Sequence, residues 1–191
     1  TQPSNIGLGI SKQKNNNFLY LHYRPLFIDM ADIQDNKLQQ SQVSILTFDV
    51  LLNDKVSKLS KLDLINIKSY PSQTIFYKPI SWAVLSGLNR FNNNNSLKLD
   101  NKLSMGKSVL LNNNLYMNSM LSIGFESSVF YSAPELSFTY NLGNSNKIGF
   151  STEFKYYFKD EYYINKAFYS YRYKNFIYQF NYDHDSSIDP N

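Results

Sequence analysis

Residues 147–158 read KIGFSTEFKYYF, and the character of their side chains alternates along the chain. The even-numbered positions carry apolar or aromatic side chains and one threonine, while positions 147 to 155 with odd numbers carry Lys, Gly, Ser, Glu and Lys. Successive side chains of a β-strand point to opposite faces, so this segment would form a strand with one apolar and one polar face. A helix would scatter the same apolar residues around its circumference. Residues 147–158 therefore predict an amphipathic strand.

The same alternation recurs along the chain in segments of about ten residues, which is typical of transmembrane β-strands. The pattern predicts eleven strands, over 5–13, 18–27, 43–53, 58–69, 81–91, 102–111, 115–126, 134–142, 147–158, 162–173 and 175–184. Within the fourth of these the apolar phase slips between Leu64 and Ile65, which predicts a β-bulge.

Polar turns separate the expected strands. Asn-rich stretches at 15–17, 112–114 and 144–146 predict tight turns, because Asn tolerates the left-handed backbone conformation. Longer connections are expected at about 28–42, 70–80, 92–101 and 127–133. No linker or composition shift divides the chain, so residues 1–191 are expected to form one domain.

The strand pattern favours an all-β fold, an antiparallel up-and-down transmembrane β-barrel in the bacterial outer membrane. The mean hydropathy of −0.41 is compatible with such a barrel, because lipid-facing and interior-facing residues alternate. Closed bacterial barrels usually have an even number of strands, so we expect about 12, with the last strand beyond residue 191. The alternative is that one weak strand is miscounted and the barrel has ten. The opening residues Thr1-Gln2-Pro3-Ser4 lack the charged and apolar regions of a signal peptide. Because an outer-membrane barrel must cross the inner membrane, we expect the chain to be a mature fragment of a longer precursor.

The composition argues against several other classes of protein. The chain has no cysteine, which excludes disulfides and thiolate metal sites, and no cofactor or metal is expected. The net charge of +4 is small, and the lysines are scattered among turns rather than gathered on one face. Nucleic acid is therefore not an expected partner.

Three short motifs in the first ninety residues resemble a known family. They are SNIGLG at 4–9, YRPLFID at 23–29, and the pair INIKS at 65–69 and FYKPISW at 76–82. Their order and spacing resemble the C-terminal barrel region of outer-membrane proteins whose N-terminal half is an Lnb-like periplasmic domain. That periplasmic domain belongs to a papain-like, cysteine-dependent class. Ile28 stands where the family pattern has His, which argues against chemistry at this position.

The resemblance implies that outer-membrane lipid and a covalently linked N-terminal periplasmic domain are the partners of this chain. It also implies that any thiol chemistry lies outside these residues. The motif residues would lie at the rim of the barrel, at the mouths of two long connections: Arg24, Pro25, Asp29, Ser69, Pro79, Ser81 and Trp82. We expect them either to dock the periplasmic domain or simply to cap the rim with hydrogen bonds.

Charged residues on the polar faces are expected to form a network inside the barrel. They are Arg24, Asp49, Glu126, Glu153, Lys155, Lys166 and Arg172. Small barrels are largely filled by their own side chains, and buried charges must pair. A plug of salt bridges is therefore favoured over a narrow passage or a ligand site.

Three functions follow from this pattern. The first is a non-catalytic barrel that anchors or positions a periplasmic domain. The second is an outer-membrane hydrolase acting on lipid, with His22 or His184 beside a serine; the run His184-Asp185-Ser186 has the spacing but lies in a polar tail. The third is a soluble, lipocalin-like barrel, in which the apolar stripe would point inward around a ligand.

Overall fold

The structure of the chain is a computed structural model. It describes residues 5–13, 16–28, 39–54, 57–73, 76–90, 97–143, 145–158, 160–173 and 176–186. The predicted site residue Asp29 lies outside these ranges, as do most of the connection 28–42 and part of the connection 92–101.

The described residues contain strands and turns. The strands are β1 (Asn5–Gln13), β2 (Asn16–Arg24), β3 (Leu26–Ile28), β4 (Gln39–Leu52), β5 (Ser57–Gln73), β6 (Ser81–Asn89), β7 (Lys98–Asn112), β8 (Leu115–Glu126), β9 (Val129–Asn141), β10 (Asn146–Tyr156), β11 (Glu161–Tyr173) and β12 (Phe176–Asp185). No helix in this part of the chain is long and apolar enough to cross a membrane.

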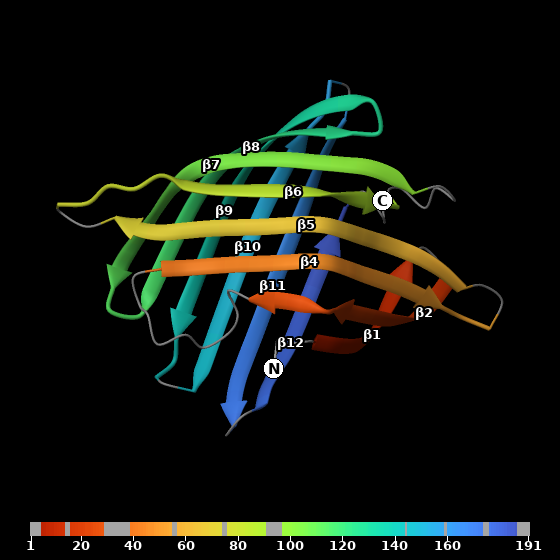
Figure 1. The fold of residues 1–191 in the computed structure, drawn as a ribbon, viewed down its shortest axis with the longest axis horizontal. Helices are drawn as coiled ribbons and strands as arrows, with labels where there is room; N and C mark the ends of the chain where they lie inside the picture. Colours follow the sequence, from red (N-terminus) through yellow and green to blue (C-terminus); the bar gives the residue numbers. More distant parts are fainter. Residues whose placement is uncertain are drawn as a thin grey trace.

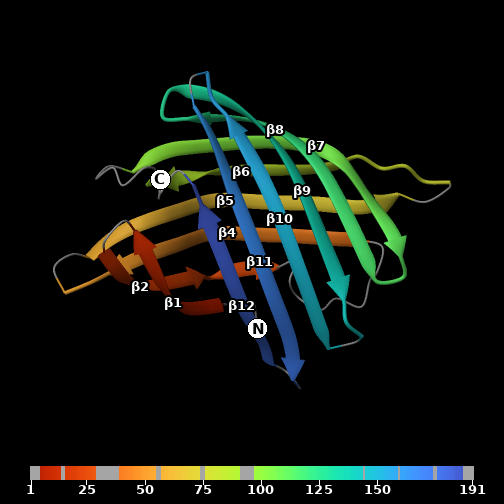
Figure 2. The ribbon, with the colours of Figure 1, turned by 180° about the vertical axis from the view of Figure 1, so that it is seen from behind.

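All the strands belong to one sheet, in the order β1-β2-β4-β5-β6-β7-β8-β9-β10-β11-β12, with β3 pairing with β4 as a continuation of β2. Each neighbouring pair on this path is antiparallel and joins strands that follow one another in sequence. The sheet curls so that β4 to β7 form one wall and β9 to β12 cross behind them at a steep angle (Figures 1 and 2). The prediction of an all-β, up-and-down barrel architecture is confirmed.

The two faces of the curled sheet differ in polarity. In β10, Ile148, Phe150 and Phe154 are exposed on the outer face, whereas Lys147 and Glu153 are buried on the inner face. The same division holds in β8 and β9, where the inner face carries small polar residues such as Ser122 and Ser137. The interior is therefore mainly polar and the outside mainly apolar.

The predicted bulge lies where the sequence placed it. The pairing of β5 with β6 shifts by one residue between Asp63 and Ile65, which leaves Leu64 as the extra residue. The alternation then resumes in the new phase, with both Leu64 and Ile65 exposed. Gly87 faces the bulge, and a Cβ at this position would lie 2.4 Å from the carbonyl oxygen of Leu62. The bulge therefore needs a residue without a side chain on the neighbouring strand.

The predicted long connection at 127–133 is wrong. Ser127 and Ser128 form a tight turn with φ angles of 49° and 79°, and β9 begins directly at Val129. Pro134 lies within β9, although proline cannot donate a ladder hydrogen bond. It is accommodated because the β9–β10 pairing is interrupted between Ser132 and Glu135. At the Asn-rich turn after β7, the Asn112 side chain accepts the backbone N–H groups of Asn114 and Leu115, as an Asx turn does.

Candidate functional site in the polar interior

A salt bridge crosses the interior between two strands that are not neighbours. The Lys102 ammonium on β7 donates to both carboxylate oxygens of Glu153 on β10, at 3.0 and 2.9 Å. Strands β8 and β9 lie between them in the sheet. The pair can form only because the sheet is curled, so it fastens the curvature of this region.

A second group of side chains surrounds Glu126, the last residue of β8. Lys155 approaches its carboxylate at 3.4 Å, and the Tyr157 hydroxyl donates a hydrogen bond to the same carboxylate. Burial, and the adjacent Glu126 carboxylate, raise the pKa of Tyr157 above its ordinary value. Tyr157 therefore keeps its proton and remains a hydrogen-bond donor at neutral pH.

Tyr131 joins these charges to Asp100 at the start of β7. Its hydroxyl donates to Asp100 at 3.2 Å, and Lys155 lies over its ring, 4.8 Å from the centroid. Its ring also packs against that of Tyr157, with centroids 5.3 Å apart. Together with the Lys102–Glu153 pair, these residues form one network, here called the β7–β10 network.

A separate cluster occupies the interior side of β2, β4 and β5. His22 and Asp49 are cross-strand partners, and a hydrogen bond joins the His22 Nδ1 atom to the Asp49 carboxylate. The Tyr20 hydroxyl lies 3.4 Å from the same Nδ1 atom. On β5, Lys61 pairs with Asp63 at 2.8 Å. The histidine that a hydrolase would need is thus held by a carboxylate on the polar face, away from the apolar outer surface.

Glycines make room for the rings that fill the interior. Gly124 faces Tyr131 across the β8–β9 pair, and a Cβ on Gly124 would lie 2.1 Å from the tyrosine ring. Gly149 faces Phe168 in the same way, and again a Cβ would lie 2.1 Å from the ring. The alternating Gly7 and Gly9 of the opening motif pair with His22 and Tyr20. Each ring therefore lies over a neighbouring strand that presents no side chain beneath it.

The interior becomes accessible to solvent near β11 and β12. Lys166 and Asp183 are cross-strand partners on the inner face, and both are exposed. The carboxylates of Asp183, Glu153, Glu135 and Asp63 all act favourably on the Lys166 charge. Lys166 thus lies among carboxylates that come from four strands of the curled sheet.

The sequence-predicted interior residues fall into these groups. Glu126, Glu153 and Lys155 belong to the β7–β10 network, Asp49 to the His22 cluster, and Lys166 to the accessible region. Arg24 is buried at the end of β2, and Arg172 is half-buried near the end of β11. The predicted residues therefore share one face of the sheet but are divided among several places on it.

Sequence reasoning missed several members of these networks. Lys102 and Asp100 were overlooked because alternation at the start of β7 is weak, although Asp100, Lys102 and Ser104 do share the inner face. Lys61 and Asp63 were overlooked because the bulge shifts the phase of β5. Lys102 already lies at a polar position of the predicted strand 102–111, and extending the period-two pattern two residues earlier would have included Asp100.

The rim residues of the family-like motifs lie at one end of the sheet, here called the long-loop rim, where the β2–β4 and β5–β6 connections lie. The Ser81 hydroxyl is buried and hydrogen-bonded to Ser108 at 2.7 Å. Trp82 is exposed on the outer face and pairs with Ser69, which lies within β5 rather than at its end. Pro25 and Pro79 are both half-buried. These positions include a hydrogen bond that ties two strands together at the rim.

The second histidine lies elsewhere. The His184 ring packs against that of Tyr163 at 5.7 Å, at the opposite end of the sheet. The nearby Ser186 hydroxyl accepts the backbone N–H of Tyr163 at 2.9 Å. In the part of the chain that the structure describes, no group of three His, Asp or Glu side chains could hold a metal ion. Chemically, the ion pairs and hydrogen bonds of the interior neutralise the charged side chains that the curled sheet encloses.

Comparison with known proteins gives a family without an assigned function. The family model of a domain of unknown function, DUF7840, matches residues 2–188. No curated protein and no solved structure matches the chain significantly.

Proposed function

The chain belongs to the DUF7840 family of domains of unknown function, and we propose that it is an outer-membrane β-barrel that anchors a periplasmic domain without taking part in catalysis. The observation that carries this proposal is the polarity of the sheet. Apolar side chains cover the outer face, and ion pairs fill the interior. A soluble barrel of lipocalin type would need the reverse, with the apolar stripe around an internal cavity.

The outer face carries the side chains that a bilayer requires along each strand. Aliphatic residues lie in the middle of strands, such as Leu103 and Met105 on β7 and Leu121 on β8. Exposed aromatic residues lie both in the middle of strands, such as Phe150 and Phe180, and close to strand ends. Those close to strand ends include Trp82, Tyr140, Tyr173 and Tyr178 toward the long-loop rim and Phe130, Tyr156 and Tyr163 toward the opposite rim. Two aromatic belts around an aliphatic band are typical of membrane barrels.

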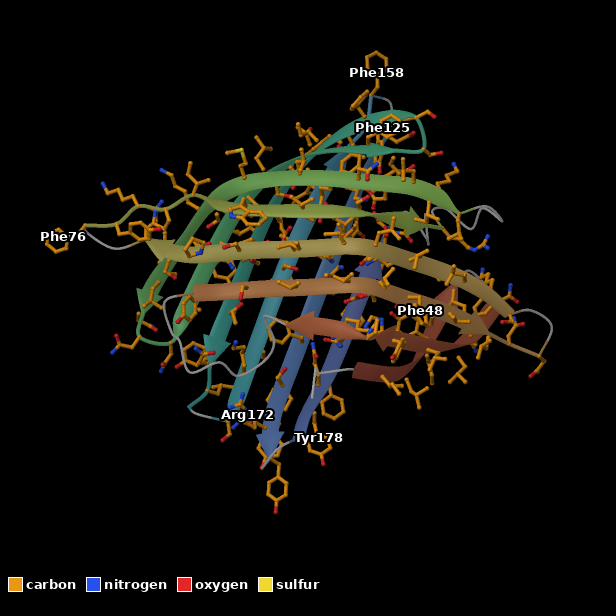
Figure 3. The ribbon with its side chains drawn as sticks, viewed as in Figure 1. Phe48, Phe76, Phe125, Phe158, Arg172 and Tyr178 are labelled. Atoms are coloured by element: carbon orange, nitrogen blue, oxygen red, sulfur yellow. The ribbon has the colours of Figure 1, made fainter. Side chains whose placement is uncertain are left out.

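The long-loop rim suits attachment to another domain or to the membrane interface. Strand β1 begins at this rim, since β1 runs away from it and β2 returns to it. In the β5–β6 connection Phe76 is 97% exposed and stands clear of the sheet (Figure 3). A domain covalently linked before residue 1, as the resemblance implies, would therefore lie beside the β2–β4 and β5–β6 connections.

The proposal is tested by locating the attached domain in cells. We expect the full-length protein to be found in the outer membrane and to resist extraction by alkaline carbonate. Without residues 1–191, the remaining domain should be recovered in the soluble periplasm. The matched control is a full-length chain carrying Ser119→Ala, an exposed position on β8, which should leave the location unchanged.

Two results would contradict the proposal. One is a full-length protein that is soluble without detergent. The other is a truncated domain that stays in the membrane fraction, because the barrel would then not be its anchor. Lipid hydrolysis by the purified barrel, lost in His22→Ala or His184→Ala, would favour the hydrolase instead.

A further inference from the structure

The sheet has two edges that no described strand covers. Strand β1 pairs with β2 and strand β12 with β11, and neither has a second partner in the described part of the chain. We infer that one further strand of the same polypeptide fills the seam between β1 and β12, running antiparallel to both. This inference rests on the proposed membrane location and is supported by the exposure and the direction of the two edge strands.

The outer side chains of β1 are more exposed than those in the middle of β7 and β8. Leu8 and Ile10 are 74% and 86% exposed, against 61% for Met105 and 65% for Ile123. On the other edge, Phe180 of β12 is 68% exposed. The edges also present backbone N–H and C=O groups that no ladder satisfies. Such groups do not face the hydrocarbon of a bilayer, where water cannot bind them. A strand in the seam would cover these outer side chains and would pair with the backbone groups of the two edges.

The exposure of interior side chains also indicates a gap between β1 and β12. Lys166, Asn181 and Asp183 face inward beside the seam and are exposed, whereas Ser122 and Glu153, on the inner faces of β8 and β10, are buried. Through an open seam, the two charged groups would meet lipid, which is unfavourable for an ionised side chain. The strand that fills the seam must therefore place polar side chains inward and apolar side chains outward.

The direction of the edges selects what can fill the gap. Eleven strands on the path are joined by antiparallel pairings only, so β1 and β12 run in the same direction. Direct pairing of β1 with β12 would be parallel, and so would pairing with a second copy inserted the same way. A single intervening strand is antiparallel to both edges and gives the even strand number of bacterial barrels. Every neighbouring pair on the path joins consecutive strands, so the same polypeptide is the expected source.

The test uses cysteine pairs in the full-length protein in bacterial outer membranes. Residues 1–191 contain no cysteine. Any cysteine of the attached domain, which the resemblance implies, is replaced by serine so that it gives no background. Leu8→Cys is combined in turn with Tyr178→Cys, Phe180→Cys and Tyr182→Cys, all on the outer face. The control pair is Ala167→Cys with Tyr182→Cys, which are cross-strand partners on β11 and β12.

We expect the control to form a disulfide after mild oxidation, and each β1–β12 pair to give less than about a tenth of its yield. Edge strands separated by one strand lie roughly 9–10 Å apart, beyond the usual Cα separation of disulfides of about 4.4–6.8 Å. An intramolecular β1–β12 disulfide at the control yield would show direct closure and overturn the inference. A disulfide-linked dimer would show closure by a second copy and overturn it equally.

A photo-crosslinking amino acid at Leu8, and separately at Phe180, identifies the occupant. Both should capture one and the same peptide of the same chain, recognised by mass spectrometry. Capture of lipid at both positions would mean that the seam is open. The two proposals can fail independently. A soluble protein that still forms the control disulfide contradicts the membrane location, whereas the β1–β12 disulfides and the crosslinked peptide report on the seam alone.

Discussion

The Lys102–Glu153 pair is buried, so its two partners depend on one another. Lys102→Met alone should lower the free energy of unfolding by roughly 3–5 kcal/mol, because it leaves the Glu153 carboxylate without its cation. The double variant Lys102→Met with Glu153→Gln should recover most of that loss. The free energies of unfolding of both variants are measured by urea unfolding in detergent, monitored by the fluorescence emission of the single tryptophan, Trp82. Equal loss in the single and double variants would contradict the role of the pair.

Gly124 provides a second test at the scale of one side chain. Gly124→Ala should destabilise the protein by about 1–3 kcal/mol, because the new methyl group overlaps the Tyr131 ring. The control is Ser119→Ala, on the outer face of the same strand. Adding Tyr131→Ala to Gly124→Ala should remove the clash, although the Asp100 hydrogen bond is lost with it. Unfolding midpoints that are identical for Gly124→Ala and Ser119→Ala would show that the ring can move aside.

Individual interior partners were only partly predictable from the sequence. Alternation assigns a residue to a face, and it correctly placed Glu153, Lys155 and Glu126 inside the sheet. It does not indicate which strands meet across the interior, because that depends on how far the sheet curls. Lys102 and Glu153 are 51 residues apart in the sequence, so their contact could be identified only from the structure.

Among the elements, β10 offers adjacent residues on opposite faces. Phe150→Arg should make the free energy of folding into the membrane less favourable by ~2–4 kcal/mol, because it places a charge on the outer apolar face. Ser151→Arg, on the inner face, should be milder because other charged groups line the interior. Folding yield into lipid vesicles at several urea concentrations compares the two. Equal tolerance of both substitutions would count against a transmembrane barrel.

The β8–β9 turn is a site where stability can be gained. Ser128 has a φ angle of 79°, which is unfavourable for a residue with a side chain. Ser128→Gly should therefore stabilise the protein by roughly 1 kcal/mol. Ser119→Gly, within β8, should destabilise it, because glycine weakens a strand. A lower unfolding midpoint for Ser128→Gly would mean that its side chain makes a contact that outweighs the backbone strain.

Strand positions were predicted well because the period-two signal is local. The predicted bounds 5–13 and 115–126 coincide with β1 and β8, and the bulge was found from the phase of Leu64 and Ile65. The predicted strand 134–142 begins at Pro134, five residues later than β9, which starts at Val129. Proline is tolerated there by a gap in the β9–β10 pairing, which depends on the neighbouring strand and not on the local sequence.

At the scale of the whole molecule, the sequence indicates an outer apolar face and a polar interior, since each strand carries both. It does not indicate the curl of the sheet or the steep crossing of its two walls. These features arise from twist accumulated over many strands.

The meander of consecutive strands also determines how the molecule should resist a mechanical load. If one terminus is pulled from a lipid bilayer by an atomic force microscope, strands should leave in successive hairpins, because each strand is bonded to its neighbours in sequence. The Lys102–Glu153 bridge spans β7 to β10, so extraction of that region should need a higher force than extraction of the hairpin β1–β2. Lys102→Met should remove the excess force while leaving the hairpin spacing of the force peaks unchanged.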